Sequence, residues 1–155
     1  EHFLAVLQGA NLNGAHLEDA DLPEVELQDA TIFNVRLEGA YLGKAHLENA
    51  NLGESHLEEA YLSEAHLEGA ELIGAYLQGA KLMGAHLEGA SLTSARLQGA
   101  DLQGAHLDRA VLLGTHLEGA NLEEAVWLTS EQVKVAITDE ETKLPEYLDR
   151  EHGGL

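Results

Sequence analysis

A histidine followed two positions later by an acidic residue recurs along this chain, and such a pair could do chemistry. The pairs lie at multiples of ten residues: His16–Glu18, His46–Glu48, His56–Glu58, His66–Glu68, His86–Glu88, His106–Asp108 and His116–Glu118. Imidazole beside carboxylate can bind Zn²⁺ or Ni²⁺, and it can respond to pH near neutrality. The same pairs can also form a plain hydrated surface, so the fold that positions them has to be established first.

Composition limits the function classes. The 155 residues carry a formal charge of −20, from 8 Lys+Arg against 28 Asp+Glu. Direct binding of nucleic acid or of an anionic membrane needs a basic patch and is not expected. There is no Cys, so disulfides and thiolate metal sites are excluded. No apolar run reaches the roughly 18 residues of a membrane-spanning helix, so membrane insertion is not expected.

The first residues, "EHFLAVL", contain neither Met nor a basic stretch. We therefore expect no signal peptide. The missing Met predicts a processed protein or a domain of a longer chain. The sequence does not encode a compartment, and the bacterial cytoplasm is taken as the default.

A five-residue repeat dominates the chain. Leu, replaced once by Ile32, recurs every five residues from Leu7 to Leu122, and a small residue precedes each by two positions from Ala5 to about Val126. This period fits neither a helix nor a flat strand. The small residue and Leu can lie on one side of an extended segment, while the next residues turn a corner. Four corners close a square of 20 residues.

The predicted fold is therefore an all-β solenoid: a right-handed quadrilateral parallel β-helix of about six coils, with a short C-terminal α-helical cap. Coils should stack about 4.8 Å apart, with the handedness of parallel crossovers. One inward column should consist of Leu7, Leu27, Leu47, Leu67, Leu87 and Leu107. The corner position holds Gly in many units and Lys44, Glu54 or Arg109 in others, which predicts a mixture of turn types.

Several units match a known consensus. "ANLNG" at Ala10, "ADLPE" at Ala20, "ANLGE" at Ala50, "ADLQG" at Ala100 and "ANLEE" at Ala120 resemble the A(D/N)LXX repeat of the pentapeptide-repeat proteins. The resemblance implies the same right-handed quadrilateral β-helix and no metalloenzyme activity. It also implies one specific possibility, because similar proteins include members that bind topoisomerases by imitating duplex DNA.

The repeat stops near Val126, so we divide the chain into a β-helix at 1–128 and a capping segment at 129–155. Thr129 and Gln132 have the spacing of a capping box, which predicts a helix to about Ile137. Pro145 should stop any helix before it. The end of a solenoid needs covering, and the predicted covering residues are Trp127, Val133, Ile137, Leu144, Tyr147 and Leu148.

A 20-residue coil assigns the His–acid pairs to two opposite faces, where all should be exposed. One carries His46, His66, His86 and His106 beside Glu48, Glu68, Glu88 and Asp108; the other carries His16, Arg36, His56, Tyr76, Arg96 and His116. A metal-binding stripe is one interpretation of the four-His column. We prefer an electrostatic one, in which imidazoles that can protonate relieve repulsion among the carboxylates. No metal or other cofactor is predicted.

The other two faces carry apolar side chains. Phe33, Ile73, Val111 and Leu113 share one face, and Tyr41, Tyr61 and Met83 lie on the opposite one. Exposed apolar groups indicate contact with a protein partner when they gather in a patch. Catalysis is not expected, because a filled prism offers no concave site.

The preferred function is a non-catalytic rigid scaffold or protein–protein interaction module, as a monomer or a weak dimer. The alternative is an acidic DNA mimic that binds a topoisomerase such as DNA gyrase. It depends on charge density: residues 1–126 hold 21 acidic and five basic residues, a formal charge of −16. A further alternative is a structural segment of a larger protein.

Overall fold

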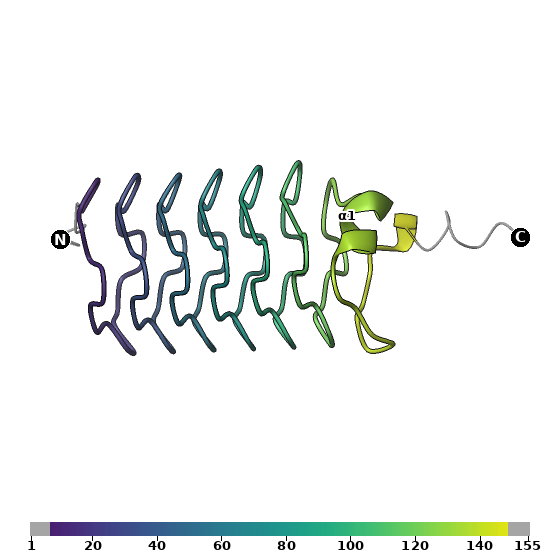
Figure 1. The fold of residues 1–155 in the computed structure, drawn as a ribbon, viewed down its shortest axis with the longest axis horizontal. Helices are drawn as coiled ribbons and strands as arrows, with labels where there is room; N and C mark the ends of the chain where they lie inside the picture. The colour runs from purple at the N-terminus through teal and green to yellow at the C-terminus, as the bar shows by residue number, and fades with distance from the viewer. Residues whose placement is uncertain (1–6, 149–155) are drawn as a thin grey trace, which may run out of the picture.

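The chain winds into a stack of four-sided coils. The computed structural model describes residues 7–148, in which successive coils lie side by side along one axis (Figure 1). Residues 20 apart form parallel bridges on every side, as in Asn11–Thr31, Arg36–His56 and His46–His66. The predicted quadrilateral β-helix is confirmed. The outer ends of the predicted ranges 1–128 and 129–155 lie outside the described residues.

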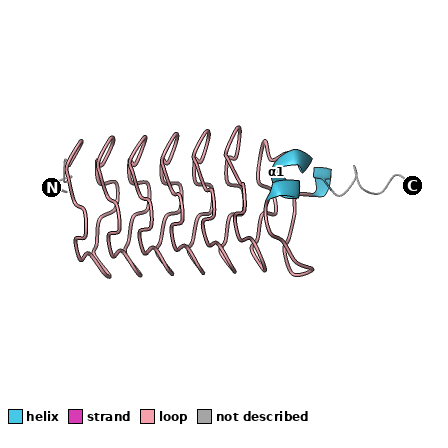
Figure 2. Ribbon diagram, in the orientation of Figure 1, coloured by secondary structure: helices cyan, strands magenta, loops and turns pink. Residues whose placement is uncertain are grey.

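Backbone hydrogen bonds join each coil to the next in a fixed pattern. Leu67 N donates to His86 O at 2.7 Å, Gly69 N donates to Glu88 O at 2.9 Å, and His86 N donates back to Ala65 O at 2.9 Å. Each side contributes a single bridging residue, so residues 7–148 contain no continuous strand (Figure 2). The ladder nevertheless satisfies the main chain, as buried backbone requires.

The interior is filled by the Leu and small positions. In the predicted column, Leu27, Leu47, Leu67, Leu87 and Leu107 are only 1–3% exposed. Leu7, in the first described coil, is only partly buried and packs against the same core. Two small positions hold hydroxyls, and both find partners: Thr115 Oγ1 donates to Leu92 O at 2.7 Å, and Ser55 Oγ donates to Ile32 O. The core is therefore apolar and satisfied.

The corners do not mix turn types. Every corner residue from Gly9 to Glu124 has a left-handed backbone, with φ between 52° and 68°, whether it is Gly or not. The corners close by a hydrogen bond such as Ala70 N to Leu67 O, except after Ile32, where Val35 N donates to Ser55 Oγ at 3.2 Å instead. The predicted mixture was wrong, because Gly and non-glycine corner residues share the same left-handed backbone. The inter-coil ladder holds non-glycine corners such as Glu54 in this costly region.

One short helix, α1 (Ser130–Val135), begins the cap. Its N-cap is Thr129, and the predicted capping box with Gln132 is present on both sides. The helix ends two residues earlier than predicted. Ile137 is not on its inner face but bridges His116 as the next rung of the ladder, with its side chain exposed. That rung ends the helix, because Ile137 N must donate to Thr115 O.

Trp127 was predicted to cover the core, and this was wrong. Its side chain is 70% exposed and its φ is 62°, while Leu128 takes the buried position at 2% exposure. One extra residue therefore separates Val126, which bridges His106, from the next core side chain. The left-handed backbone at Trp127 turns the indole outward.

The rest of the cap continues the coil on two sides. Ile137 and Lys143 form the last parallel bridges, with His116 and Asn121. Residues 146–148 are helical and follow Pro145. Leu148 is buried at 3% exposure, whereas Val133 and Leu144 are partly buried against the core. No helix within residues 7–148 is long and apolar enough to cross a membrane.

Candidate interaction surfaces

The β-helix places outward side chains in columns parallel to its axis. A bridging residue directly precedes each core Leu, so its side chain points outward, above the equivalent residue of the next coil. Ring centroids in these columns lie 4.4–4.9 Å apart, which is close to the usual spacing of strands. Four faces result, named here after His46, His56, Phe33 and Tyr41.

The His46 face carries the four-His column. His46, His66 and His86 stack nearly parallel, with ring centroids 4.8 and 4.9 Å apart. His46 Nδ1 lies 3.1 Å from Glu48 Oε1, and His66 Nδ1 lies 3.3 Å from Glu68 Oε1. These side chains were predicted to be exposed, but they are only about a third exposed. Each shields the neighbour above it in the column, which a single-coil argument omits.

The acidic side chains lie against the coil and are partly desolvated. In Glu48, Glu68 and Glu88 one carboxylate oxygen, Oε2, is covered by protein and has no hydrogen-bond partner. Gln28, Gln78 and Gln98 place an amide oxygen in the same situation. Each His therefore contacts the outer oxygen, and the inner oxygen is hidden from solvent and from partners.

The His56 face is more varied and more fully paired. Arg36 Nε lies 3.0 Å from Glu18 Oε1, and Arg36 Nη2 lies 3.0 Å from Glu38 Oε1, so one guanidinium joins two coils. The hydrogen bond to Glu38 raises the pKa of Arg36. A bond from its own backbone N–H lowers the pKa of Glu18, and the bond from His116 lowers that of Glu118. These interactions keep the acids ionised.

Aromatic and cationic groups continue the same column. The His56 and Tyr76 rings stack 4.4 Å apart, and Arg96 Cζ lies 5.0 Å from the centre of Tyr76. Such stacking supports the column through dispersion and cation–π attraction.

The Phe33 face holds the predicted residues Phe33, Ile73, Val111 and Leu113, each 40–56% exposed. The coil between Phe33 and Ile73 has Gly53, which is buried. Phe33 ring atoms lie 3.2–3.3 Å from where a Gly53 side chain would begin. The Phe33 ring therefore covers the gap left by Gly53.

The Tyr41 face holds a preformed aromatic pair. Tyr41 and Tyr61 stack with ring centroids 4.6 Å apart and planes 6° apart, and both residues are nearly half exposed. Met83, in the next coil and 44% exposed, extends the apolar character of this face. In this pair each ring contacts its partner and leaves its outer part available.

An open depression of about 640 Å³ lies where the cap leaves the regular coils. It is lined by His106, Asp108, Val126, Trp127, Leu128, Thr129 and Tyr147. The sequence argument for a prism without hollows did not anticipate it, because that argument placed Trp127 inside. In the sequence, only Trp127, which interrupts the five-residue repeat, pointed to this depression. Exposed Trp127 thus joins the candidate surface residues.

Taken together, these features define a solid parallel β-helix that presents columns of side chains. The chain belongs to the pentapeptide repeat family, whose model matches segments that together span residues 4–126. The family and the right-handed quadrilateral fold predicted from the sequence are confirmed. A comparison with curated protein sequences found no match.

Solved structures support the same assignment. A pentapeptide repeat protein from the Arabidopsis thaliana thylakoid lumen is 28% identical, with a TM-score of 0.62, over 69% of this chain and 77% of that protein. One from Nostoc is 32% identical, with a TM-score of 0.56, over 77% of this chain and 82% of the other. QnrB1, a plasmid-mediated fluoroquinolone resistance protein, is 13% identical over 87% of this chain and 84% of its own, with a TM-score of 0.36. At that level the likeness carries no argument about function.

Proposed function

We propose that this chain is a non-catalytic scaffold whose rigid faces bind another protein. Pentapeptide repeat proteins are generally structural or interaction modules rather than enzymes. The observation that carries the proposal is the Tyr41–Tyr61 stack, which is nearly half exposed on the outer surface. Rigid aromatic side chains give large contact areas at small entropic cost, and they are enriched at binding hot spots.

The test is capture of a partner by the intact chain, with variants that separate the faces. Tyr41→Ser with Tyr61→Ser should abolish capture, and binding by the parent should persist in about 0.5 M salt, where long-range charge attraction is screened. Tyr76→Ser is the matched control, because Tyr76 is also stacked but lies on the His56 face. Phe33→Ser with Ile73→Ser tests the Phe33 face. Capture that survives both double substitutions would refute the proposal.

An acidic DNA mimic is the second candidate, and the charge of the repeat region supports it. Six coils of about 4.8 Å make a rod of about 30 Å. A charge of −16 over residues 1–126 then corresponds to about one charge per 1.9 Å, against one per about 1.7 Å in duplex DNA.

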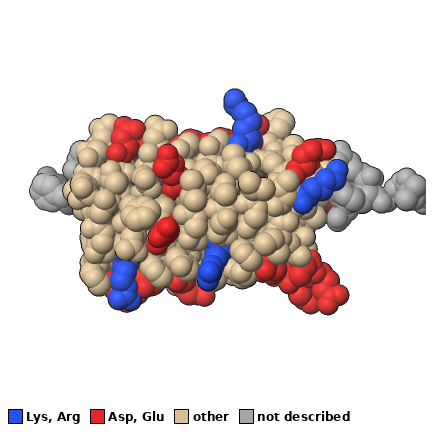
Figure 3. Space-filling model, viewed as in Figure 1, with Lys and Arg blue, Asp and Glu red and all other residues tan. Residues whose placement is uncertain are grey.

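The arrangement of the charges favours the scaffold instead. Arg36 neutralises part of the Glu18–Glu38 column, and the inner oxygens of Glu48, Glu68 and Glu88 are hidden. Figure 3 shows basic side chains scattered among the acidic ones on one side of the molecule. A mimic must present its charges to a basic groove.

DNA supercoiling by purified gyrase separates the two candidates. We expect no inhibition when this protein is added. Inhibition at low concentration that weakens with salt and is lost in a Glu48→Gln, Glu68→Gln, Glu88→Gln variant would replace our proposal with mimicry. The remaining alternative, a structural segment of a larger protein, predicts neither inhibition nor capture of a separate partner.

A further inference from the structure

In the four-His column, the pairing between histidine and carboxylate changes at one place, between His86 and His106. Above it each histidine pairs with the glutamate of its own coil, but the acid beside His106 is the shorter Asp108. Asp108 Oδ2 instead accepts a hydrogen bond from Arg109 Nε at 3.1 Å. His106 Nδ1 therefore faces the preceding coil, and its ring is tilted by 33° to that of His86, against 1° and 3° between the rings above.

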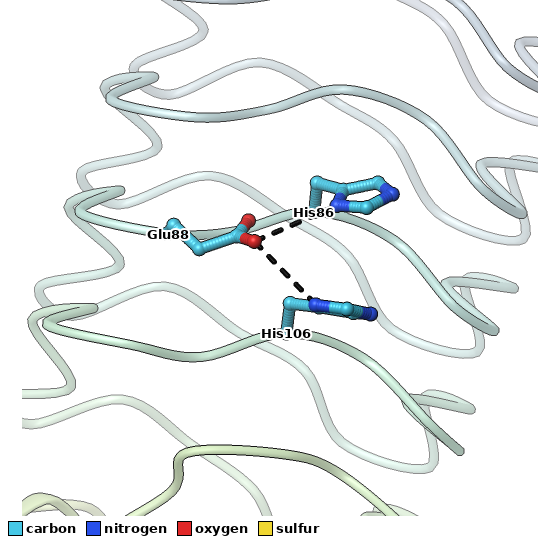
Figure 4. A group of neighbouring side chains, drawn as sticks. All are labelled: His86, Glu88 and His106. Carbon is cyan, nitrogen blue, oxygen red and sulfur yellow. Dashed lines mark ion pairs between the residues drawn. The ribbon is translucent and has the colours of Figure 1, made fainter.

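This change brings two imidazoles to one carboxylate oxygen. His86 Nδ1 and His106 Nδ1 each lie 3.5 Å from Glu88 Oε1 (Figure 4). In the other His–Glu pairs on these two faces the corresponding distances are 3.0–3.3 Å. All three ligand atoms lie within 4.8 Å of one another.

The two separations from Glu88 Oε1 fit a bound metal ion. Nitrogen and oxygen ligands lie about 2.0–2.1 Å from Zn²⁺ in a tetrahedral site, which places them about 3.4 Å from each other. Two histidines and one carboxylate are also a common zinc ligand set, with the fourth position left to water. The two nitrogen–oxygen separations of 3.5 Å are already close to this value, and the same spacing is required of the two histidine nitrogens, which lie within 4.8 Å of each other.

Two other groups on these faces are poorer candidates. Glu38–His56–Glu58 and Glu48–His66–Glu68 each contain one histidine and two carboxylates. Their histidines are already close to the carboxylate of their own coil, at 3.0 and 3.3 Å. Imidazole is the ligand that suits Zn²⁺, whereas carboxylate suits Mg²⁺ and Ca²⁺. Of the three groups, the one with two histidines therefore suits Zn²⁺ best.

The backbone supports the arrangement. His86 N donates to Ala65 O and His106 N donates to Ala85 O, both at 2.9 Å, so the ladder fixes the two ligands on adjacent coils. Both side chains are about a third exposed, which leaves a path for an ion. We propose that His86, Glu88 and His106 form a binding site for one Zn²⁺ ion, completed by water. The proposal is independent of the scaffold function.

Calorimetric titration of the full chain with Zn²⁺, after treatment with a chelator, tests it. We expect one saturable site per chain, and His106→Gln should weaken binding by at least about tenfold, since one of three ligands is lost. His46→Gln is the matched control: it lies in the same column, with a side-chain exposure of 39% against 37% for His106, and should bind like the parent. Glu88→Gln is a second, isosteric ligand variant.

The only tryptophan gives an independent readout. Trp127 and His106 line the same depression, so Co²⁺ bound at this site should quench Trp127 fluorescence in a saturable way, and Zn²⁺ should reverse the quenching. His106→Gln and Glu88→Gln should remove this effect, and His46→Gln should not. Absence of saturable Zn²⁺ binding by the parent, or equal losses in His46→Gln and His106→Gln, would overturn the proposal.

Discussion

The repeat coils and the C-terminal cap satisfy the same kind of backbone groups by different means. In the coils most of these groups bond to the main chain of a neighbouring coil, as in His86 N to Ala65 O. In the cap, side chains take over part of this role. Gln132 Nε2 donates to Leu107 O and Ala110 O, both at 2.8 Å, and Thr142 Oγ1 donates to Leu117 O at 2.9 Å.

Two further contacts complete this set of side-chain bonds. Tyr147 OH donates to Ala125 O at 3.0 Å, and Asp139 Oδ1 accepts from Gly119 N at 2.9 Å. The difference shows at which positions the identity of the side chain matters for the fold. A coil needs only its Leu, its small residue and a bendable corner, so outward positions are free to vary. The cap depends on particular polar side chains, several of which make the contacts that a further coil would have made.

Substitution in the core should have the largest effect and sharpens the contrast. Leu67→Asp places a charge at a position that is 1% exposed, and an unpaired buried charge costs several kcal/mol. We expect loss of the folded state, measured by circular dichroism. Trp127→Asp, at the 70% exposed aromatic of the cap, is the control and should leave the melting temperature nearly unchanged. An unchanged melting point for Leu67→Asp would contradict the assigned register.

Removal of one cap side chain should have the next largest effect. Gln132→Ala loses both carbonyl contacts and half of the capping box. Leu107 O keeps its bond from Ala110 N, but the orphaned Ala110 O and the lost cap together cost about 1–3 kcal/mol, seen as a lower midpoint in denaturant. Glu131→Ala changes an exposed neighbour in the same helix and should cost little. Equal effects of the two would mean that the cap is not held through Gln132.

Substitution at a corner of the repeat region should lower the stability less. Gly89 has a φ of 68° and open space where a side-chain carbon would be added, so Gly89→Ala tests backbone conformation alone. We expect a loss of about 0.5–1 kcal/mol in unfolding free energy. Gly43→Ala is the control, because Gly43 is not left-handed and its nearest neighbour, Ser63 O, is 3.9 Å away. A stabilised Gly89→Ala variant would show that the left-handed backbone at this corner does not disfavour Ala.

The junction between coils and cap should show a small effect that depends on pH. The Gly119 N–H is the main cause of the lowered pKa of Asp139, whose usual value is 3.8. A carboxyl with a lowered folded pKa stabilises the protein above its unfolded pKa, and this contribution disappears as the pH falls through the folded value. Asp139→Asn should therefore melt below the parent from pH 7 to about 5, and the difference should shrink below 3.8. A constant difference at all pH values would exclude the charge as its cause.

Prediction from sequence succeeded where the chain repeats. The five-residue spacing of Leu and Ala fixes which residues face inward in every coil, so Leu47 or Leu87 could be placed by counting. The cap has no repeat to fix its register. One additional residue at Trp127 shifts the core position to Leu128, and the need for a further rung moves Ile137 out of the predicted helix. The half-buried state of the His46 column was also missed, because it arises from neighbouring coils.

The bridges between residues 20 apart also have a consequence for how the molecule folds. Every such contact spans the same short length of chain, so no coil has a greater loop-closure cost than another. A coil gains its hydrogen bonds only from a formed neighbour, which makes growth sequential along the axis, as in one-dimensional nearest-neighbour systems. Unfolding should then begin at an end, and the lifetime of the native rod should depend on how firmly Gln132 and Asp139 hold the last coils.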